Sequence, residues 1–98
     1  MADAASLPRS RIKVPQHVVY RSLPSETIVL NLQTGKYHGL NPTAGSMLAA
    51  LQRTACLRDA VAVVAKEYAQ PCAAVEQDMR ALCSALLDRG LIELNGEA

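Results

Sequence analysis

The sequence contains no phenylalanine and no tryptophan, and its aromatic residues are three tyrosines, Tyr20, Tyr37 and Tyr68. A hydrophobic core must therefore be built from leucine, valine, alanine, isoleucine and methionine, which favours closely packed small helices over a large pocket lined by aromatic rings. Half of the 98 residues are hydrophobic. This is enough to fold rather than stay disordered, and the length fits one domain.

Neither sign of charge dominates the chain. Ten Lys and Arg residues are interspersed with nine Asp and Glu residues, for a formal net charge of +1. A nucleic-acid binder usually has a clustered basic face, and a membrane-surface helix has a stripe of Lys and Arg. The densest basic group, Arg9, Arg11 and Lys13, is interpreted as a solvated arm. The pattern therefore indicates neither a nucleic-acid partner nor a membrane surface.

Long hydrophobic runs are also missing. No apolar stretch approaches the roughly 18–20 residues that span a bilayer, and the start of the chain, MADAASLPRSR, lacks the layout of a secretory signal. Three cysteines, Cys56, Cys72 and Cys83, fall in predicted helices and are interpreted as reduced thiols that pack as small hydrophobic groups. We expect a cytoplasmic protein.

The spacing of the reactive side chains argues against a catalytic or metal site. The sequence has no CxxC and no HxxxH pattern, and His17 and His38 lie on predicted strands. Cys72 and Cys83 would be separated by about 16 Å along one helix, too far to form a disulfide or to share a metal ion. The glycines match no nucleotide-binding pattern. We expect no catalytic residue, no metal and no cofactor.

The first half of the chain predicts strands. Residues 1–10 lack periodicity and are predicted to be a flexible tail before a domain spanning 11–95. Residues 17–23 are rich in strand-forming side chains, and Pro24-Ser25 follows as a turn. Residues 26–33 alternate with period two. One face carries Ile28, Leu30 and Leu32, and the other carries Thr27, Val29 and Asn31.

Thr34-Gly35 predicts a tight turn, because glycine tolerates the positive φ that such a turn needs. Residues 36–40 then form the next strand, antiparallel to 26–33. Together with 17–23 they predict a three-stranded antiparallel meander.

The second half predicts helices. Asn41 suits an N-cap and Pro42 the first helical position. A second helix is predicted over about 57–68 and a third over 71–89, which ends at Gly90. The third helix has an apolar face made of Val75, Met79, Leu82 and Leu86. The chain closes with a short extended piece over 91–94.

The order of these elements predicts the fold class. A three-stranded sheet of this size cannot bury both faces by itself, so the helices must cover one face. We predict an α+β domain of winged helix-turn-helix-like type, with a three-stranded antiparallel sheet followed by three helices.

The stretch TIVLNLQTGKYHGLNPTAGSMLAAL, residues 27–51, resembles the signature of PqqD-like proteins. These are recognition elements for the precursors of ribosomally made, post-translationally modified peptides. The upstream VPQHVVYR resembles the first strand of the family and LLDRGLIEL its usual close. The resemblance covers roughly residues 12–94.

Within the family, the run GKYHGLNPTAG is most similar to the discrete recognition proteins of lasso-peptide biosynthesis. Relatives of that type often carry a bulky aromatic residue in the first helix, where this chain has Ser46-Met47. A PqqD-type peptide chaperone of pyrroloquinoline quinone biosynthesis is the alternative.

The resemblance implies a way of binding. The leader segment of a precursor peptide would add as a fourth antiparallel strand beside the third strand, while alternate leader side chains enter pockets against the third helix. Gly39 would let the second backbone approach closely. The implied peptide-binding residues are Lys36, Tyr37, His38, Gly39, Leu40, Val75, Asp78, Met79 and Leu82, with Arg80 as a further rim residue.

The residues alone leave other interpretations open. Tyr37, Leu40, Met79 and Leu82 could each be core side chains instead of ligand contacts. The resemblance implies two partners, the leader and a processing enzyme such as a leader peptidase or possibly a cyclase. A winged-helix DNA-binding regulator and a protein–protein adaptor without a peptide ligand are the competing functions.

Overall fold

The computed structural model describes residues 10–54 and 56–97 and confirms a mixed α+β fold with a three-stranded antiparallel sheet and three helices. Of the tail predicted over 1–10, residues 1–9 lie outside the described residues, and Ser10 begins the first strand. In chain order the elements are β1 (Ser10–Lys13), β2 (Val18–Ser22), β3 (Thr27–Asn31), β4 (Tyr37–Leu40), α1 (Pro42–Arg53), α2 (Leu57–Tyr68), α3 (Cys72–Asp88) and β5 (Glu93–Glu97).

Strands β2, β3 and β4 form the predicted meander in that spatial order. The turn predicted at Thr34-Gly35 is confirmed, with Gly35 at a φ of 76°. Asn31 stabilises this turn with hydrogen bonds from its backbone and its side chain. Its backbone N–H donates to the Lys36 carbonyl at 2.8 Å, and its side-chain Oδ1 accepts from the Gln33 N–H at 2.9 Å. The register of β4 on β3 is therefore fixed by the turn itself.

Helix α1 begins at the predicted residue, α2 spans the predicted range, and α3 is one residue shorter at each end than predicted. Asn41 caps α1, because its Oδ1 accepts the Ala44 N–H at 2.8 Å. Gly90, at a φ of 71°, ends α3, and the next N–H, that of Leu91, donates to the Leu86 carbonyl at 2.9 Å. Within the described residues, no helix is long and apolar enough to cross a membrane.

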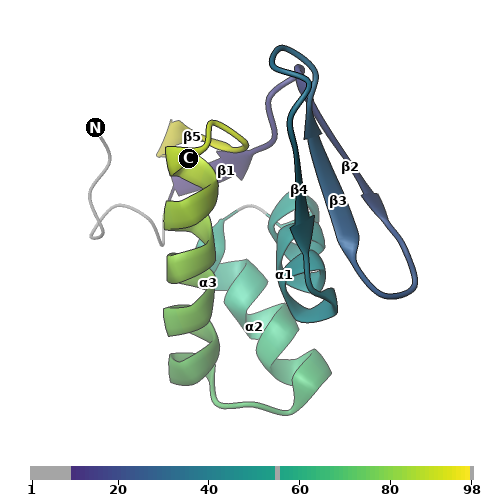
Figure 1. Ribbon diagram of the computed structural model, residues 1–98. Coiled ribbons are helices and arrows are strands. Elements are labelled where there is room, and N and C mark those ends of the chain that lie inside the picture. Colours follow the sequence, from purple (N-terminus) through teal and green to yellow (C-terminus); the bar gives the residue numbers. More distant parts are fainter. Residues whose placement is uncertain (1–9, 55, 98) are drawn as a thin grey trace.

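A second, two-stranded sheet was not predicted. Strand β1 pairs antiparallel with β5, with Ile12 opposite Leu94, so the two ends of the described chain lie together (Figure 1). Ile12 is buried in the core, and β5 continues past the domain boundary predicted at residue 95. Short strands at opposite ends of a chain show no periodicity of their own, so only the tertiary contact identifies them.

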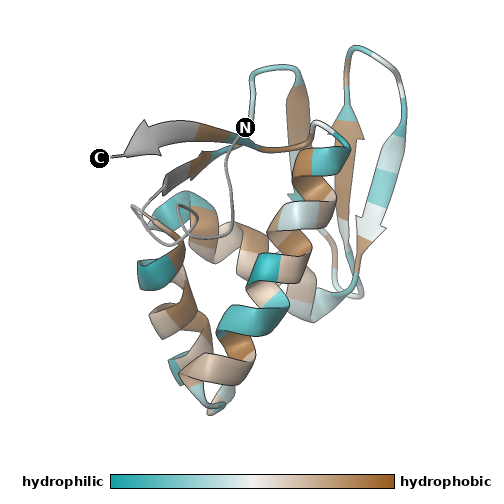
Figure 2. Cartoon of the chain, turned by 90° about the vertical axis from the view of Figure 1, so that its left-hand side faces the viewer, coloured by the Kyte–Doolittle hydropathy of each residue, from teal (hydrophilic) through white to brown (hydrophobic). Residues whose placement is uncertain are grey.

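One hydrophobic core joins both sheets to the helices. Helix α1 packs against β3 and β4 and also against α2, and α2 packs against α3. Figure 2 shows hydrophobic and hydrophilic segments alternating along the helices, as expected for amphipathic helices that face a shared core. The largest fully buried side chains are Leu48, Leu51, Leu57, Met79, Leu91, Val29, Val64 and Cys83.

Strand β3 buries its less hydrophobic face. Thr27, Val29 and Asn31 are buried against the helices, whereas the face that carries Ile28 and Leu30 points away from them. Leu32, just past the strand, is 57% exposed. Hydrophobicity alone would favour the opposite orientation. Asn31 can be buried because its side chain caps the turn amides.

The contact between Thr27 and Gly45 of α1 allows this orientation. Both residues are buried, and a Cβ added at Gly45 would lie 2.9 Å from the Thr27 Cβ and closer still to its Oγ1. Real Cβ atoms do not approach a neighbour so closely. Only glycine therefore lets β3 lie this near to α1 at this position.

The three cysteines differ in how far they are buried. Cys83 is fully buried in α3, as expected for a thiol that packs as a hydrophobic group, Cys56 is half-buried, and Cys72 is exposed at the start of α3. Packing as a small hydrophobe is therefore wrong for Cys72. Burial raises the pKa of the Cys83 thiol to about 11, although the nearby Arg80 charge lowers it in part.

This difference predicts the reactivity of the thiols. At pH 8, a thiol reagent should modify Cys72 rapidly, because its thiol is exposed to solvent. Cys83 should react only as fast as the protein unfolds, because its thiol is both buried and protonated. Single-cysteine variants that retain one or the other, followed by mass spectrometry, measure this. Rapid labelling of Cys83 in the folded protein would contradict the assignment.

The tight contact predicts that Gly45→Ala destabilises the fold. Overpacking costs about 1–3 kcal/mol, while replacing a helical glycine with alanine contributes about 1 kcal/mol in the other direction. Since Thr27 is short and buried, we expect a net loss in the free energy of unfolding, measured by urea denaturation. Thr43→Ala, at an exposed position of α1, should change it by less than about 0.5 kcal/mol. A Gly45→Ala protein as stable as the wild type would disprove the packing argument.

Candidate functional site

Strand β4 is an edge strand of the meander, with β3 as its neighbour on one side. The Asn31 N–H donates to the Lys36 carbonyl, and antiparallel pairing alternates from there. His38 and Leu40, opposite Val29 and Thr27, therefore direct their backbone groups toward β3. The N–H and C=O groups of Tyr37 and Gly39 point to the free edge.

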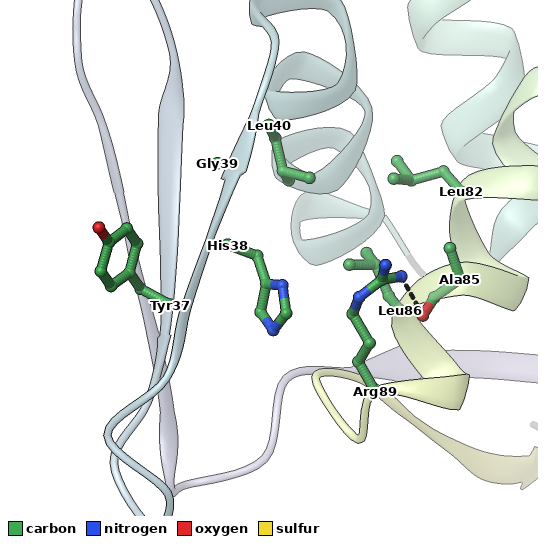
Figure 3. Close-up of a pocket in the computed structure, with 8 residues that line it drawn as sticks. All are labelled: Tyr37, His38, Gly39, Leu40, Leu82, Ala85, Leu86 and Arg89. Atoms are coloured by element: carbon green, nitrogen blue, oxygen red, sulfur yellow. Dashed lines mark hydrogen bonds between the residues drawn. The ribbon is translucent and has the colours of Figure 1, made fainter.

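The free edge of β4 borders a pocket of about 370 Å³ between this strand and α3. His38 and Leu40 extend from β4 toward α3, and the side chain of Arg89, just past the end of α3, runs back along the last turn of the helix beside the groove (Figure 3). The Tyr37 side chain points to the opposite side of the sheet and is 70% exposed. The lining residues are Tyr37, His38, Gly39, Leu40, Leu82, Ala85, Leu86 and Arg89. This pocket and the edge beside it are named the β4–α3 groove below.

One face of α3 supplies the helical wall of the groove. The lining residues of α3 and its end are Leu82, Ala85, Leu86 and Arg89, of which 82 and 86, and likewise 85 and 89, are four residues apart, so they share one face. Leu82 is half-buried and Leu86 is 3% exposed, so the floor of the groove is continuous with the core. The wall is therefore rigid and apolar, with a charge at its C-terminal end.

The structure brings only part of the predicted peptide-binding set together. Tyr37, His38, Gly39, Leu40 and Leu82 line the pocket. Val75 and Met79, with exposed fractions of 5% and 0%, are instead core side chains.

The remaining predicted polar residues lie around the groove. Lys36 is exposed just before β4, and Asp78 is exposed one turn before Leu82, and neither lines the pocket. Arg80 donates from Nε to Glu76 Oε2 at 3.0 Å, an ion pair within α3. Of the predicted apolar face of α3, only Leu82 and Leu86 line the pocket, and the other helical residues that line it lie nearer the C-terminal end of the helix.

Three groove residues, Ala85, Leu86 and Arg89, were not predicted as binding residues. The length of β4 indicates only that a short segment of α3 can line the groove, and no signal in the sequence identifies which segment. Since this strand is only four residues long, it lies beside only part of the longer α3, and the pocket lining shows that this part is near the C-terminal end of the helix. Helical periodicity shows which face of α3 is apolar but not which segment of that face meets the strand.

Gly39 lies in the regular part of β4. It continues the β3–β4 register without a bulge, opposite Ile28. A Cβ at this position would meet Glu26 Oε1 at 2.9 Å, and its partner Ile28 is on the face of the sheet that points away from the helices. The missing side chain therefore opens the outer face of the sheet, and the edge itself is free because no described strand pairs with it.

The groove offers main-chain hydrogen-bonding groups beside an apolar pocket. Sheet proteins accept extended peptides through this combination, because the edge gives register and the pocket selects side chains. Among the described residues, no group of three His, Cys, Asp or Glu side chains could hold a metal ion.

Comparisons with known proteins found a matching family and similar solved structures. Residues 26–92 match the family described as coenzyme PQQ synthesis protein D (PqqD). A solved structure described as TbiB1 in complex with the TbiA(beta) leader peptide is similar, with 30% sequence identity and a TM-score of 0.74 over 88% of this chain and 98% of that chain.

A second solved structure has the same fold. Described as lasso peptide synthetase B1 complexed with the leader peptide, it is 20% identical, with a TM-score of 0.75 over 85% of this chain and 98% of that one. A search of curated proteins found no match. The family match covers most of the chain and includes β3, β4 and all three helices, so the chain belongs to the PqqD family.

Proposed function

We propose that this protein binds the leader segment of a ribosomally made precursor peptide by adding it as an antiparallel strand to β4. The observation that carries the proposal is the free edge at Tyr37 and Gly39 beside the apolar β4–α3 groove. The similar TbiB1 structure was solved with a leader peptide. The lasso peptide synthetase B1 complex, alike in fold, favours lasso-peptide biosynthesis as the pathway.

Main-chain bonds and side chains would contribute differently to binding. Two edge residues, Tyr37 and Gly39, each offer one donor and one acceptor, and a peptide strand can satisfy all four groups. These bonds set the register and do not distinguish one sequence from another. The leader side chains that point toward Leu40 and Leu82 would enter the groove and provide the selectivity.

We further propose that the domain has no catalytic chemistry of its own and presents the bound leader to a processing enzyme, a leader peptidase or a cyclase. Strand addition supports this, because it holds the leader extended and uses only one of its two edges. The opposite edge of the leader would remain accessible to a second protein. The binding and the processing would then be divided between two proteins.

A winged helix-turn-helix-like arrangement remains part of the proposal, supported by a hairpin sheet followed by three helices. A DNA-binding function is not favoured. The third helix carries acidic Glu76, Asp78 and Asp88 on or next to the turns that hold its basic residues, and Arg80 is paired with Glu76. This charge distribution would repel phosphates as much as attract them.

Strand addition predicts that Gly39→Pro weakens leader binding by at least about tenfold. Proline removes the N–H that donates to the peptide and places a ring at the edge. Gly39→Ala keeps the N–H and directs its methyl group toward the flexible Glu26 carboxylate, so it should bind within about threefold of wild type. The measurement is fluorescence anisotropy with the leader of the precursor encoded beside this protein, with duplex DNA as the negative control.

Backbone N-methylation of the leader tests the same bonds without changing the protein. Methylation should abolish binding at the two positions opposite Tyr37 and Gly39, which lie two residues apart, and should be tolerated at the position between them. A folded Gly39→Pro protein with wild-type affinity, or a methylation pattern without period two, would rule out strand addition at β4.

Presentation to a peptidase predicts a coupled loss. Wild-type protein should accelerate leader removal by the peptidase encoded with it, and Gly39→Ala should retain most of that acceleration. Gly39→Pro should lose it, because the leader is no longer held. Cleavage followed by mass spectrometry measures the rate. Equal acceleration by all three proteins would show that leader binding and presentation are not linked.

A further inference from the structure

We propose that the β4–α3 groove selects leaders in which an aliphatic residue is followed two positions later by an acidic residue, and that Arg89 determines the preference for the acid. The inference rests on the proposed function, because it assumes an antiparallel peptide on β4. It adds the direction and the chemistry of the sequence that the groove accepts.

The two ends of the groove differ in chemistry. At one end, Leu40 of β4 and Leu82 of α3 point toward each other, and Leu86 lies farther along the groove, next to the Arg89 guanidinium (Figure 3). At the other end, His38 and Arg89 approach each other across the groove. An aliphatic side chain therefore fits the first end, and a hydrogen-bond acceptor with negative charge fits the second.

Arg89 is free to bind an anion while remaining ordered. Its Nη1 donates to the Ala85 carbonyl at 3.3 Å, which holds the side chain along the last turn of α3. A guanidinium has five N–H donors in a planar fork, so the others remain for a carboxylate, which they can bind in bidentate fashion. The ion pair found among the described residues joins Glu76 to Arg80, so it does not involve Arg89.

The surroundings of Arg89 favour an acidic ligand on balance. The C-terminal end of a helix carries a partial negative charge of about half an elementary charge, which the full positive charge of Arg89 exceeds. Lys36 adds a second cation on the same side. It lies opposite Asn31 in the ladder, so it shares the face of His38 rather than that of Tyr37. Asp88, next to Arg89, is exposed and does not line the pocket.

The direction of β4 determines the order in which the aliphatic and the acidic residue must occur in a bound peptide. The strand runs from His38 at the cationic end to Leu40 at the aliphatic end. An antiparallel partner runs the other way, so its residue opposite Leu40 comes before its residue opposite His38 by two positions. Both residues point into the groove, since side chains alternate along a strand.

The reverse order is disfavoured. A peptide with the acid first would place its carboxylate at the aliphatic end, between Leu40 and Leu82. Asp78 lies one turn before Leu82 on the same face of α3 and is exposed, so this end of the groove has a negative charge on the adjacent turn of the helix. An acid there would lose hydration without gaining a partner.

The test is selection from a displayed library of random 12-residue peptides. Four proteins are compared: wild type, Arg89→Ala, Arg89→Glu and Arg58→Ala, where Arg58 is exposed on α2, outside the groove. Gly39→Pro is added to identify the peptides that depend on the edge, and circular dichroism confirms that each variant is folded. Wild type and Arg58→Ala should enrich an aliphatic residue followed two positions later by Asp or Glu.

Arg89→Ala should lose the acidic preference and keep the aliphatic one, and Arg89→Glu should prefer Lys or Arg instead. For a selected peptide, changing its acid to the neutral amide should weaken binding to wild type about tenfold and leave binding to Arg89→Ala unchanged. An acidic preference that survives in Arg89→Ala, no preference, or the acid before the aliphatic residue would overturn the inference while leaving strand addition intact. If no selected peptide depends on the edge, the proposed function fails and the inference with it.

Discussion

The close packing of Thr27 in β3 on Gly45 in α1 is the contact on which the geometry of the molecule depends. Because no side chain separates the strand from the helix, the meander stands against α1 and buries the face that carries Thr27 and Val29. Strand β4 is then left at the edge, beside α3 but not covered by it. The groove is the space that this arrangement leaves between an unpaired strand and the last turns of a helix.

Much of the fold could be predicted from local chemistry. The Asn41 cap, the Gly35 turn and the Gly90 helix end follow from the conformations that these residues prefer, and all three are present. The pairing of β1 with β5 could not be predicted, because it depends on contacts between the two ends of the chain. The buried face of β3 could not be predicted either, since the deciding partner, Gly45, lies on another element.

In the candidate site, too, some features could be predicted from local sequence and others depend on tertiary contacts. Residues 36–40 were identified as the binding strand because they follow the turn and carry the family resemblance, and the structure leaves that strand with a free edge. On α3, periodicity identified an apolar face but not which part of it borders the strand, so the predicted set includes Val75 and Met79, which are core side chains. Ala85 and Arg89 follow only from the position of the short β4 beside the helix. The edge and the groove therefore have separate roles in the proposal. The main-chain groups of the edge set the register of the peptide, and the side chains of the groove provide selectivity.

Amide hydrogen exchange, residue by residue, tests the central claim most directly, because alternation along β4 assigns each N–H to one side of the strand. His38 and Leu40 direct theirs toward β3 and should already be protected in the free protein. Tyr37 and Gly39 direct theirs to the open edge and should exchange rapidly. On addition of the leader, the account predicts new protection at Tyr37 and Gly39 and little change at His38 and Leu40. Leader binding that leaves the Tyr37 and Gly39 amides unprotected would contradict it.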